Sequence, residues 1–168
     1  MADLTPFQTV GPYFALAVPP PGRQPHLGRA GARIRIEGTL TDGAGAPVPD
    51  GLIEIWEAGG EGAAGLGRIP TDDEGRFVID TLMPDRLPGP DGREQAPHLL
   101  LRVLARGILT QLMSRIYFEG CPANASDPVL SLVPPARRPR LIAQAVAPGR
   151  FRFEITLQGP GETVFFDV

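Results

Sequence analysis

Glycine and proline divide this sequence into segments that are too short for long helices. They number 21 and 20 among 168 residues, and they lie between apolar runs rather than in one low-complexity region. Both residues are strong local signals for turns, and proline ends or kinks a helix that contains it. The chain is therefore expected to form many short strands joined by tight turns.

Most segments between these turns alternate apolar and polar residues with a period of two, which is typical of half-buried strands. The clearest alternation lies in 151–157, and the only plausible helix spans 140–146. A glycine-rich stretch at 58–67 is expected to be a loop. Seven or eight strands without βαβ spacing predict an antiparallel β-sandwich with at most one short helix. The expected strands are 33–40, 52–57, 76–82, 98–105, 111–118, 151–157 and the closing segment 163–167.

The first 32 residues are expected to form an irregular arm. Prolines such as Pro6, Pro12 and Pro25 interrupt any regular element, yet large apolar side chains such as Phe7 and Phe14 lie between them. Burying one such side chain is worth roughly 1.5–3 kcal/mol. The sequence therefore predicts an extended arm over 1–32 that docks on the chain's own domain or on a partner subunit, followed by a β-sandwich domain over 33–168.

Charge and composition exclude several classes of partner. The net charge is −3 and the 16 basic residues are dispersed, so no basic stripe attracts nucleic acid. The apolar runs are too short to span a bilayer, and the N-terminus lacks the pattern of a signal peptide. The single cysteine, Cys121, permits no intramolecular disulfide, which fits a reducing compartment. A cytoplasmic protein without nucleic-acid or membrane partners is expected.

Five segments, taken in their order along the chain, carry a resemblance to a known family. They cover nearly the whole sequence, and the first, fourth and fifth are the most specific. In this order they resemble the intradiol ring-cleaving dioxygenases. The segments are Thr5–Tyr13 (TPFQTVGPY), Gly51–Glu57 (GLIEIWE), Ala96–His98 (APH), Leu112–Glu119 (LMSRIYFE) and Gly161–Asp167 (GETVFFD).

The resemblance implies a β-sandwich paired with a homologous β subunit, with many such pairs in a larger closed assembly. In that arrangement the β subunit holds a non-haem Fe(III) through two tyrosinates and two histidines. Protocatechuate binds the iron through both phenolic oxygens, dioxygen attacks the activated ring, and the product is 3-carboxy-cis,cis-muconate. The resemblance further implies that the present chain is the subunit without iron.

Counting the possible ligands supports that expectation. Iron-binding members carry His-x-His on one strand, whereas this chain has His98 followed by Leu100 at the second position. The loops 58–67 and 82–92, where the resemblance places the tyrosine ligands, contain no tyrosine. We expect no metal ligands and no catalytic residues, with His98 hydrogen-bonded in the core. The spacing of residues alone leaves open one alternative, a metal site formed by acidic residues together with the remaining candidate ligands. These candidates are His26, His98, Tyr13 and Tyr117.

The resemblance instead implies that the arm helps to form the substrate pocket of the β subunit. On that basis Thr9, Gly11, Pro12 and Tyr13 line the pocket. Thr9 offers a hydroxyl group, Gly11 permits close approach, and Pro12 is a rigid apolar wall that needs no backbone donor. The alternative is that Pro12 and Tyr13 only anchor the arm.

Arg115 is the fifth candidate for substrate binding. A guanidinium group between the apolar residues Leu112 and Ile116 can bind a carboxylate through two hydrogen bonds, and the implied substrate has one. It can equally pair with an acid in the vestigial pocket of this subunit or at the contact between subunits, which is the role that we favour. Arg102 is expected to be an interface or buried-pair residue.

Two function classes follow. The first is the non-iron-binding subunit of an Fe(III)-dependent intradiol dioxygenase, which completes the pocket that its partner carries. The second is a stand-alone β-sandwich that binds a ligand or carbohydrate without enzymatic activity, but it leaves the apolar arm without a purpose. An independent iron-binding dioxygenase is a third reading, disfavoured because tyrosine ligands are missing.

Overall fold

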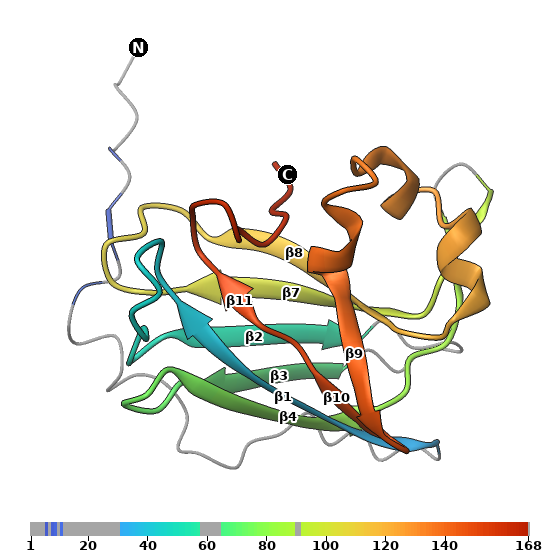
Figure 1. The fold of residues 1–168 in the computed structure, drawn as a ribbon, viewed down its shortest axis with the longest axis horizontal. Helices are drawn as coiled ribbons and strands as arrows, with labels where there is room; N and C mark the ends of the chain where they lie inside the picture. Colours follow the sequence, from blue (N-terminus) through green and yellow to red (C-terminus); the bar gives the residue numbers. More distant parts are fainter. Residues whose placement is uncertain are drawn as a thin grey trace.

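A computed structural model describes residues 6, 8–9, 11, 31–57, 65–89 and 92–167 (Figure 1). These residues form eleven strands and three 3-10 helices, with no α-helix among them, and none of their helices is long and apolar enough to cross a bilayer. The strands are β1 (Arg33–Thr41), β2 (Leu52–Glu57), β3 (Gly65–Pro70), β4 (Arg76–Leu82), β5 (Leu87–Pro88), β6 (Glu94–Gln95), β7 (His98–Leu104), β8 (Leu112–Phe118), β9 (Ile142–Ala147), β10 (Arg150–Arg152) and β11 (Ile155–Thr156); the helices are η2 (Pro122–Ser126), η3 (Leu130–Leu132) and η4 (Arg138–Leu141).

Nine of these strands belong to one strongly curled sheet. The order along it is β11-β1-β10-β9-β8-β7-β2-β3, and β4 pairs with β1. The sheet turns back on itself until β3 lies beside β4, so that it is nearly a closed barrel (Figure 1). The short strands β5 and β6 pair separately.

The predicted antiparallel β-sandwich is therefore wrong. One curled sheet replaces two packed sheets, and three of its strand pairs are parallel: β1 with β10, β1 with β11, and β8 with β9. The parallel pair of β8 and β9 forms because the connection over 119–141, which contains all three 3-10 helices, returns the chain before β9 begins. A period of two identifies a strand and its inward face, but it does not identify the neighbouring strand.

The individual strands were predicted better than their arrangement. The bounds of β2 and β4 are those expected, and β1, β7 and β8 differ by one residue at one end. The expected helix at 140–146 is wrong, because the chain there leaves η4 and pairs as β9 with both β8 and β10. The loop expected at 58–67 ends earlier, since β3 begins at Gly65, and the closing segment contributes only a bridge between Phe166 and Met113.

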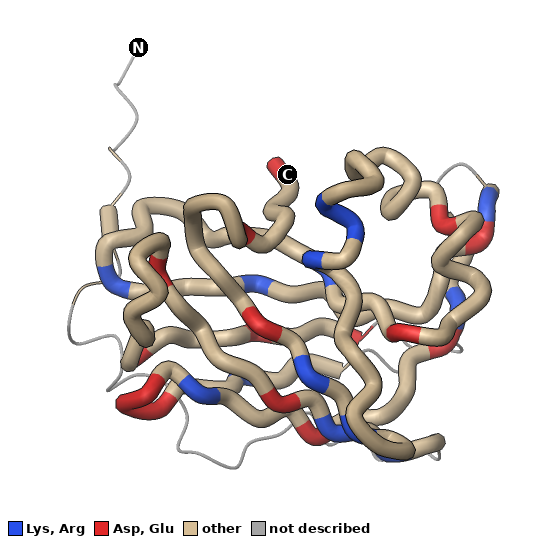
Figure 2. Tube along the Cα trace, viewed as in Figure 1, with Lys and Arg blue, Asp and Glu red and all other residues tan. Residues whose placement is uncertain are grey.

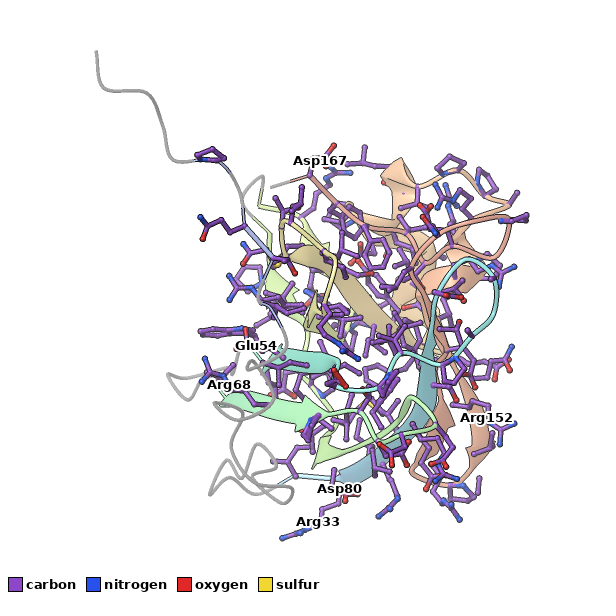
Figure 3. The ribbon with its side chains drawn as sticks, turned by 90° about the vertical axis from the view of Figure 1, so that its left-hand side faces the viewer. Arg33, Glu54, Arg68, Asp80, Arg152 and Asp167 are labelled. Carbon is purple, nitrogen blue, oxygen red and sulfur yellow. The ribbon has the colours of Figure 1, made fainter. Side chains whose placement is uncertain are left out.

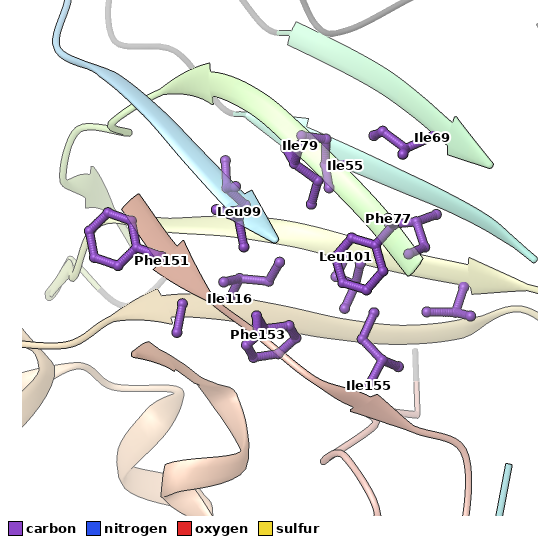
Figure 4. Packing of buried hydrophobic residues seen from close by; sticks show 14 of the residues in the cluster. Ile55, Ile69, Phe77, Ile79, Leu99, Leu101, Ile116, Phe151, Phe153 and Ile155 are labelled. Carbon is purple, nitrogen blue, oxygen red and sulfur yellow. The ribbon is translucent and has the colours of Figure 1, made fainter. Parts of the chain in front are cut away.

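The interior of the barrel is filled by the apolar side chains that alternate along the strands (Figure 4). Those of β2, β7 and β8 are almost completely buried, and the rings of Phe118 and Phe151 meet edge to face with centroids 5.1 Å apart. The labelled members in Figure 4 are Ile55, Ile69, Phe77, Ile79, Leu99, Leu101, Ile116, Phe151, Phe153 and Ile155.

Gly38, in the middle of β1, is required by this packing. A Cβ atom placed there would lie 1.8 Å from the carbonyl oxygen of Phe153 and 2.7 Å from the ring of Phe77. The backbone oxygen cannot move without breaking the contact between β1 and the segment that follows β10. Only glycine therefore allows the chain to pass this point.

We expect Gly38→Ala to destabilise the fold by about 3 kcal/mol or more, because overpacking against backbone forces a strand apart. Thermal unfolding followed by circular dichroism measures the effect. Gly161→Ala is the matched control: its Cβ would meet no atom closer than 3.9 Å, so its effect should stay within about 0.5 kcal/mol. Equal stability of the two variants would contradict this account of β1.

Candidate functional site

The centre of the predicted site lies on the outer side of the β7–β8 hairpin. His98 is opposite Tyr117 in the register of this pair, and the centroids of their rings are 5.5 Å apart. Both side chains point away from the barrel interior, which is filled by their neighbours Leu99 and Ile116. They are nevertheless buried, because a second apolar cluster that includes Leu130 covers this end of the hairpin.

A buried carboxyl group holds Tyr117 in place. The hydroxyl group of Tyr117 donates a hydrogen bond of 3.0 Å to Oδ1 of Asp127, which is 0% exposed. The same carboxyl group accepts hydrogen bonds from three backbone N–H groups, those of Val129, Leu130 and Ala96. Burial raises the pKa of Tyr117, against the opposing effect of a nearby arginine. The phenol therefore keeps its proton at neutral pH.

His98 is neutral in these surroundings. Burial lowers the pKa of its imidazole, and this effect exceeds that of the hydrogen bond to Ala96, which raises it. Nδ1 lies 2.7 Å from the carbonyl oxygen of Ala96. A carbonyl oxygen can only accept, so Nδ1 carries the proton and Nε2 has the lone pair. The prediction that His98 is hydrogen-bonded in the core is confirmed.

These residues do not fit a ferric iron site. Fe(III) favours anionic oxygen ligands, with imidazole completing the set. Tyr117 is instead a protonated phenol that is hydrogen-bonded to Asp127, and the next outward position on β7 is the apolar Leu100. Within the described ranges, no group of three or more His, Cys, Asp or Glu residues lies close enough to hold a metal ion. The other two candidates, Tyr13 and His26, lie outside the described residues.

Arg115 lies on the same outer side of β8, opposite Leu100. Its Nη1 donates to Oε1 of Gln95 at 2.8 Å and to the hydroxyl oxygen of Tyr117 at 3.2 Å. Within the part of the chain that the structure describes, Arg115 forms no ion pair. A half-buried guanidinium group with only neutral partners can still donate hydrogen bonds to a carboxylate.

The described part of the arm contacts the opposite end of the hairpin. Oγ1 of Thr9 accepts a hydrogen bond of 2.9 Å from the backbone N–H of Gly107, in the turn between β7 and β8. Gly11 follows with a φ of 71°, a conformation that glycine adopts at little cost. Gln8, which precedes Thr9, lines a cavity of about 220 Å³. The other lining residues are Leu104, Ala105, Ile108, Leu109, Thr110 and Gln111. The structure thus separates Thr9 and Gly11 from Arg115, while Pro12 and Tyr13 lie outside the described residues.

The sequence did not reveal two features of this end. The first is the contact of the arm with Gly107, because nothing in the spacing of the two segments links them. The second is Arg106, the neighbour of Gly107, whose Nε lies 2.6 Å from Oδ2 of Asp50. Asp50 has a φ of 55°, which is rare for a non-glycine residue. The sequence did contain one signal for Arg106, which is its position as a cation in the turn of the hairpin that carries the predicted site.

Comparison with known proteins identifies the chain's relatives. Residues 19–159 match the family described as Dioxygenase. Two protocatechuate 3,4-dioxygenase alpha chains are similar over nearly their whole length: that of Burkholderia cepacia is 38% identical, covering 98% of this chain and 97% of the relative, and that of Pseudomonas putida is 35% identical, covering 97% and 96%. The beta chain from Burkholderia cepacia is 30% identical over 82% of this chain and 64% of its own length.

The fold is also that of a solved dioxygenase structure. The dioxygenase domain of a dioxygenase–carbohydrate-binding fusion protein from Streptomyces sp. SirexAA-E has a TM-score of 0.64 and 28% identity, covering 94% of this chain and 99% of that domain. The chain therefore belongs to the iron-dependent family of intradiol ring-cleavage dioxygenases, and among its members it is an oxidoreductase subunit of the alpha type.

Proposed function

We propose that this chain is the non-iron-binding subunit of a protocatechuate 3,4-dioxygenase, and that it completes the substrate pocket of an iron-bearing beta subunit. The observation that carries the proposal is that the described candidates do not form a ferric donor set: Tyr117 is a protonated phenol held by Asp127, and the apolar Leu100 takes the second position after His98. The similarity to alpha chains over the whole sequence supports the same assignment. The cytoplasm is the proposed location, as expected from the sequence.

In this proposal the iron belongs to the partner. When bound there, it would supply the chemistry that makes the ring of protocatechuate susceptible to dioxygen, with 3-carboxy-cis,cis-muconate as the product. The present chain supplies positioning and exclusion of water. It assembles with the beta subunit as αβ pairs in a larger closed assembly.

The arm and the hairpin turn form the surface that reaches the partner's pocket. Thr9 accepts a hydrogen bond from Gly107, so its hydroxyl hydrogen is free to donate to the substrate. Gly11 has a φ of 71°, and the two residues that follow it in the sequence, Pro12 and Tyr13, are proposed to supply a rigid apolar group and a stacking or donor group to the pocket. The arm over 1–32 thereby acts as an appendage of the domain over 33–168.

Arg115 is assigned to the contact between the subunits rather than to the substrate. It lies on the outer side of the chain's own sheet, next to Tyr117 and Gln95, whereas the arm contacts the far end of the same hairpin. The carboxylate of protocatechuate is the alternative partner of its guanidinium group. A stand-alone binding module is not favoured, because the similarity to dioxygenase subunits extends over the whole chain.

Metal content tests the central claim. Co-expression with the beta subunit should give a coloured complex with one iron per αβ pair, because tyrosinate bound to Fe(III) absorbs visible light. Purified without the partner, this chain should be colourless and should contain less than about a tenth of an equivalent of iron, since its described residues include no tyrosinate and no group of three or more His, Cys, Asp or Glu residues that could hold the ion. The beta subunit alone is the control. Stoichiometric iron on this chain by itself would refute the assignment.

Thr9 allows a matched test of the arm. Thr9→Val removes the oxygen atom but keeps the shape of the side chain, so the arm loses its hydrogen bond to Gly107. One such bond is worth about 1 kcal/mol, so the KM for protocatechuate should rise about fivefold while kcat changes less. Thr9→Ser keeps the oxygen and should behave as the unaltered complex does. If steady-state kinetics give the same KM for all three proteins, Thr9 does not position the arm at the pocket.

A further inference from the structure

The outer side of β3, β2, β7 and β8 carries two rows of side chains that run across the strands. The register places Leu66, Trp56, Leu100 and Arg115 side by side in one row, and Arg68, Glu54, Arg102 and Met113 in the next. Figure 3 shows Glu54 and Arg68 together on this side of the molecule. We refer to these eight residues as the outer patch.

The first row exposes apolar surface. Trp56 is 42% exposed and Leu66 is 43% exposed, and they are directly opposite one another on β2 and β3. Leu100 extends the row as a half-buried neighbour. Single exposed apolar side chains are ordinary, but a contiguous apolar row beside charged groups is typical of a surface that binds another protein.

The two rows together carry a surplus of positive charge. Glu54 is buried and accepts from Nε of Arg68 at 2.7 Å and from Nη1 of Arg102 at 3.0 Å. One carboxylate thus serves two guanidinium groups, and Nε of Arg102 is buried without an acceptor among the described residues. Arg115 adds a third guanidinium group, whose described partners are the neutral Gln95 and Tyr117. Figure 2 shows basic and acidic positions interspersed along the strands of the sheet. The surplus calls for a carboxylate from outside this part of the chain.

The patch is continuous with the surface assigned to the arm. Strands β7 and β8 carry Arg102, Met113, Leu100 and Arg115, and the turn that joins them is the one that Thr9 contacts. A beta chain that is 30% identical over 82% of this sequence is homologous to it. Two homologous chains that meet around an approximate twofold axis present corresponding surfaces to each other. Through β7 and β8, the outer patch shares a hairpin with the turn that Thr9 contacts.

We infer that the outer patch is the surface on which the homologous, iron-bearing partner chain docks, with Trp56 and Leu66 buried in the contact and a carboxylate of the partner paired with Arg115. The inference rests on the proposed function, because that function supplies the partner. It adds the place of the contact and the chemistry that the partner presents. Buried aromatic and guanidinium groups are the residues that most often carry the binding energy of an interface.

Oxidative footprinting of the assembled, iron-containing complex tests this directly. Trp56 is the chain's only tryptophan, so one peptide reports on it. Hydroxyl radicals attack tryptophan and methionine faster than leucine. An open patch would therefore oxidise faster at Trp56 and Met113 than at Leu132, which lies in η3 outside the eight patch residues and is 81% exposed. We expect the reverse order, with Trp56 protected about tenfold relative to an open site. Rapid oxidation of Trp56 in the intact complex would overturn the inference.

A pair of variants gives an independent result. Leu66→Lys should reduce the yield of assembled complex about tenfold or more, because it buries a further cation in a contact that already has a surplus of them. Leu132→Lys makes the same change at a position outside the patch and should leave the yield unchanged. Leu66 is 43% exposed, so its replacement leaves the barrel interior intact. Normal assembly of Leu66→Lys would contradict the docking role.

The outcomes separate this inference from the proposed function. A coloured, active complex in which Trp56 is oxidised rapidly refutes the docking surface alone. Failure to form any complex with the beta subunit refutes both. Protection of Trp56 when the chain is expressed without the beta subunit assigns the patch to a second copy of the chain, which also overturns the inference.

Discussion

The buried carboxyl group of Asp127 is the interaction on which this end of the structure depends. It accepts hydrogen bonds from Ala96, just before β7, from Tyr117 on β8, and from Val129 and Leu130 at the start of η3. Removing one partner from a buried polar network leaves the others unpaired, so the network is stable only as a whole. It fixes the connection over 119–141 against the hairpin, and that connection determines where β9 enters the sheet.

The same network explains why Tyr117 is not available as an iron ligand. A tyrosine must lose its proton to bind Fe(III), but the Tyr117 phenol keeps its proton in a hydrogen bond to Asp127 and accepts a hydrogen bond from Arg115. Burial favours the neutral phenol further by raising its pKa. His98 is neutral as well and is committed to the backbone by its Nδ1. Tyr117, Asp127 and His98 are thus committed to one another and to the backbone, whereas Arg102 and Arg115 on the same side of the hairpin lack an anionic partner for part of their donors among the described residues.

Much of the fold and part of the site could be predicted from the sequence. The period of two located β1, β2, β4, β7 and β8, because burial of alternate side chains leaves a direct pattern. It could not predict the curled sheet, since parallel pairing of β8 with β9 depends on a long connection without periodic pattern. At the site, the absence of tyrosines and the Leu100 substitution were visible in the sequence, whereas the roles of Asp127 and Gln95 were not. Both are polar residues outside the central strands, and only the fold brings them to Tyr117 and Arg115.

The arrangement of charge also indicates how specificity arises in such a pair. If every arginine on this surface were paired with a carboxylate of its own chain, a partner's carboxylate would add little binding energy. Here Glu54 is shared by two arginines, and Arg115 has only neutral partners among the described residues. Exposed apolar contacts such as Trp56 and Leu66 favour association with many surfaces, but uncompensated guanidinium groups disfavour any partner that lacks a carboxylate at the matching place. Two identical chains would bring surpluses of the same sign together, so this distribution favours a homologous but different partner over a second copy.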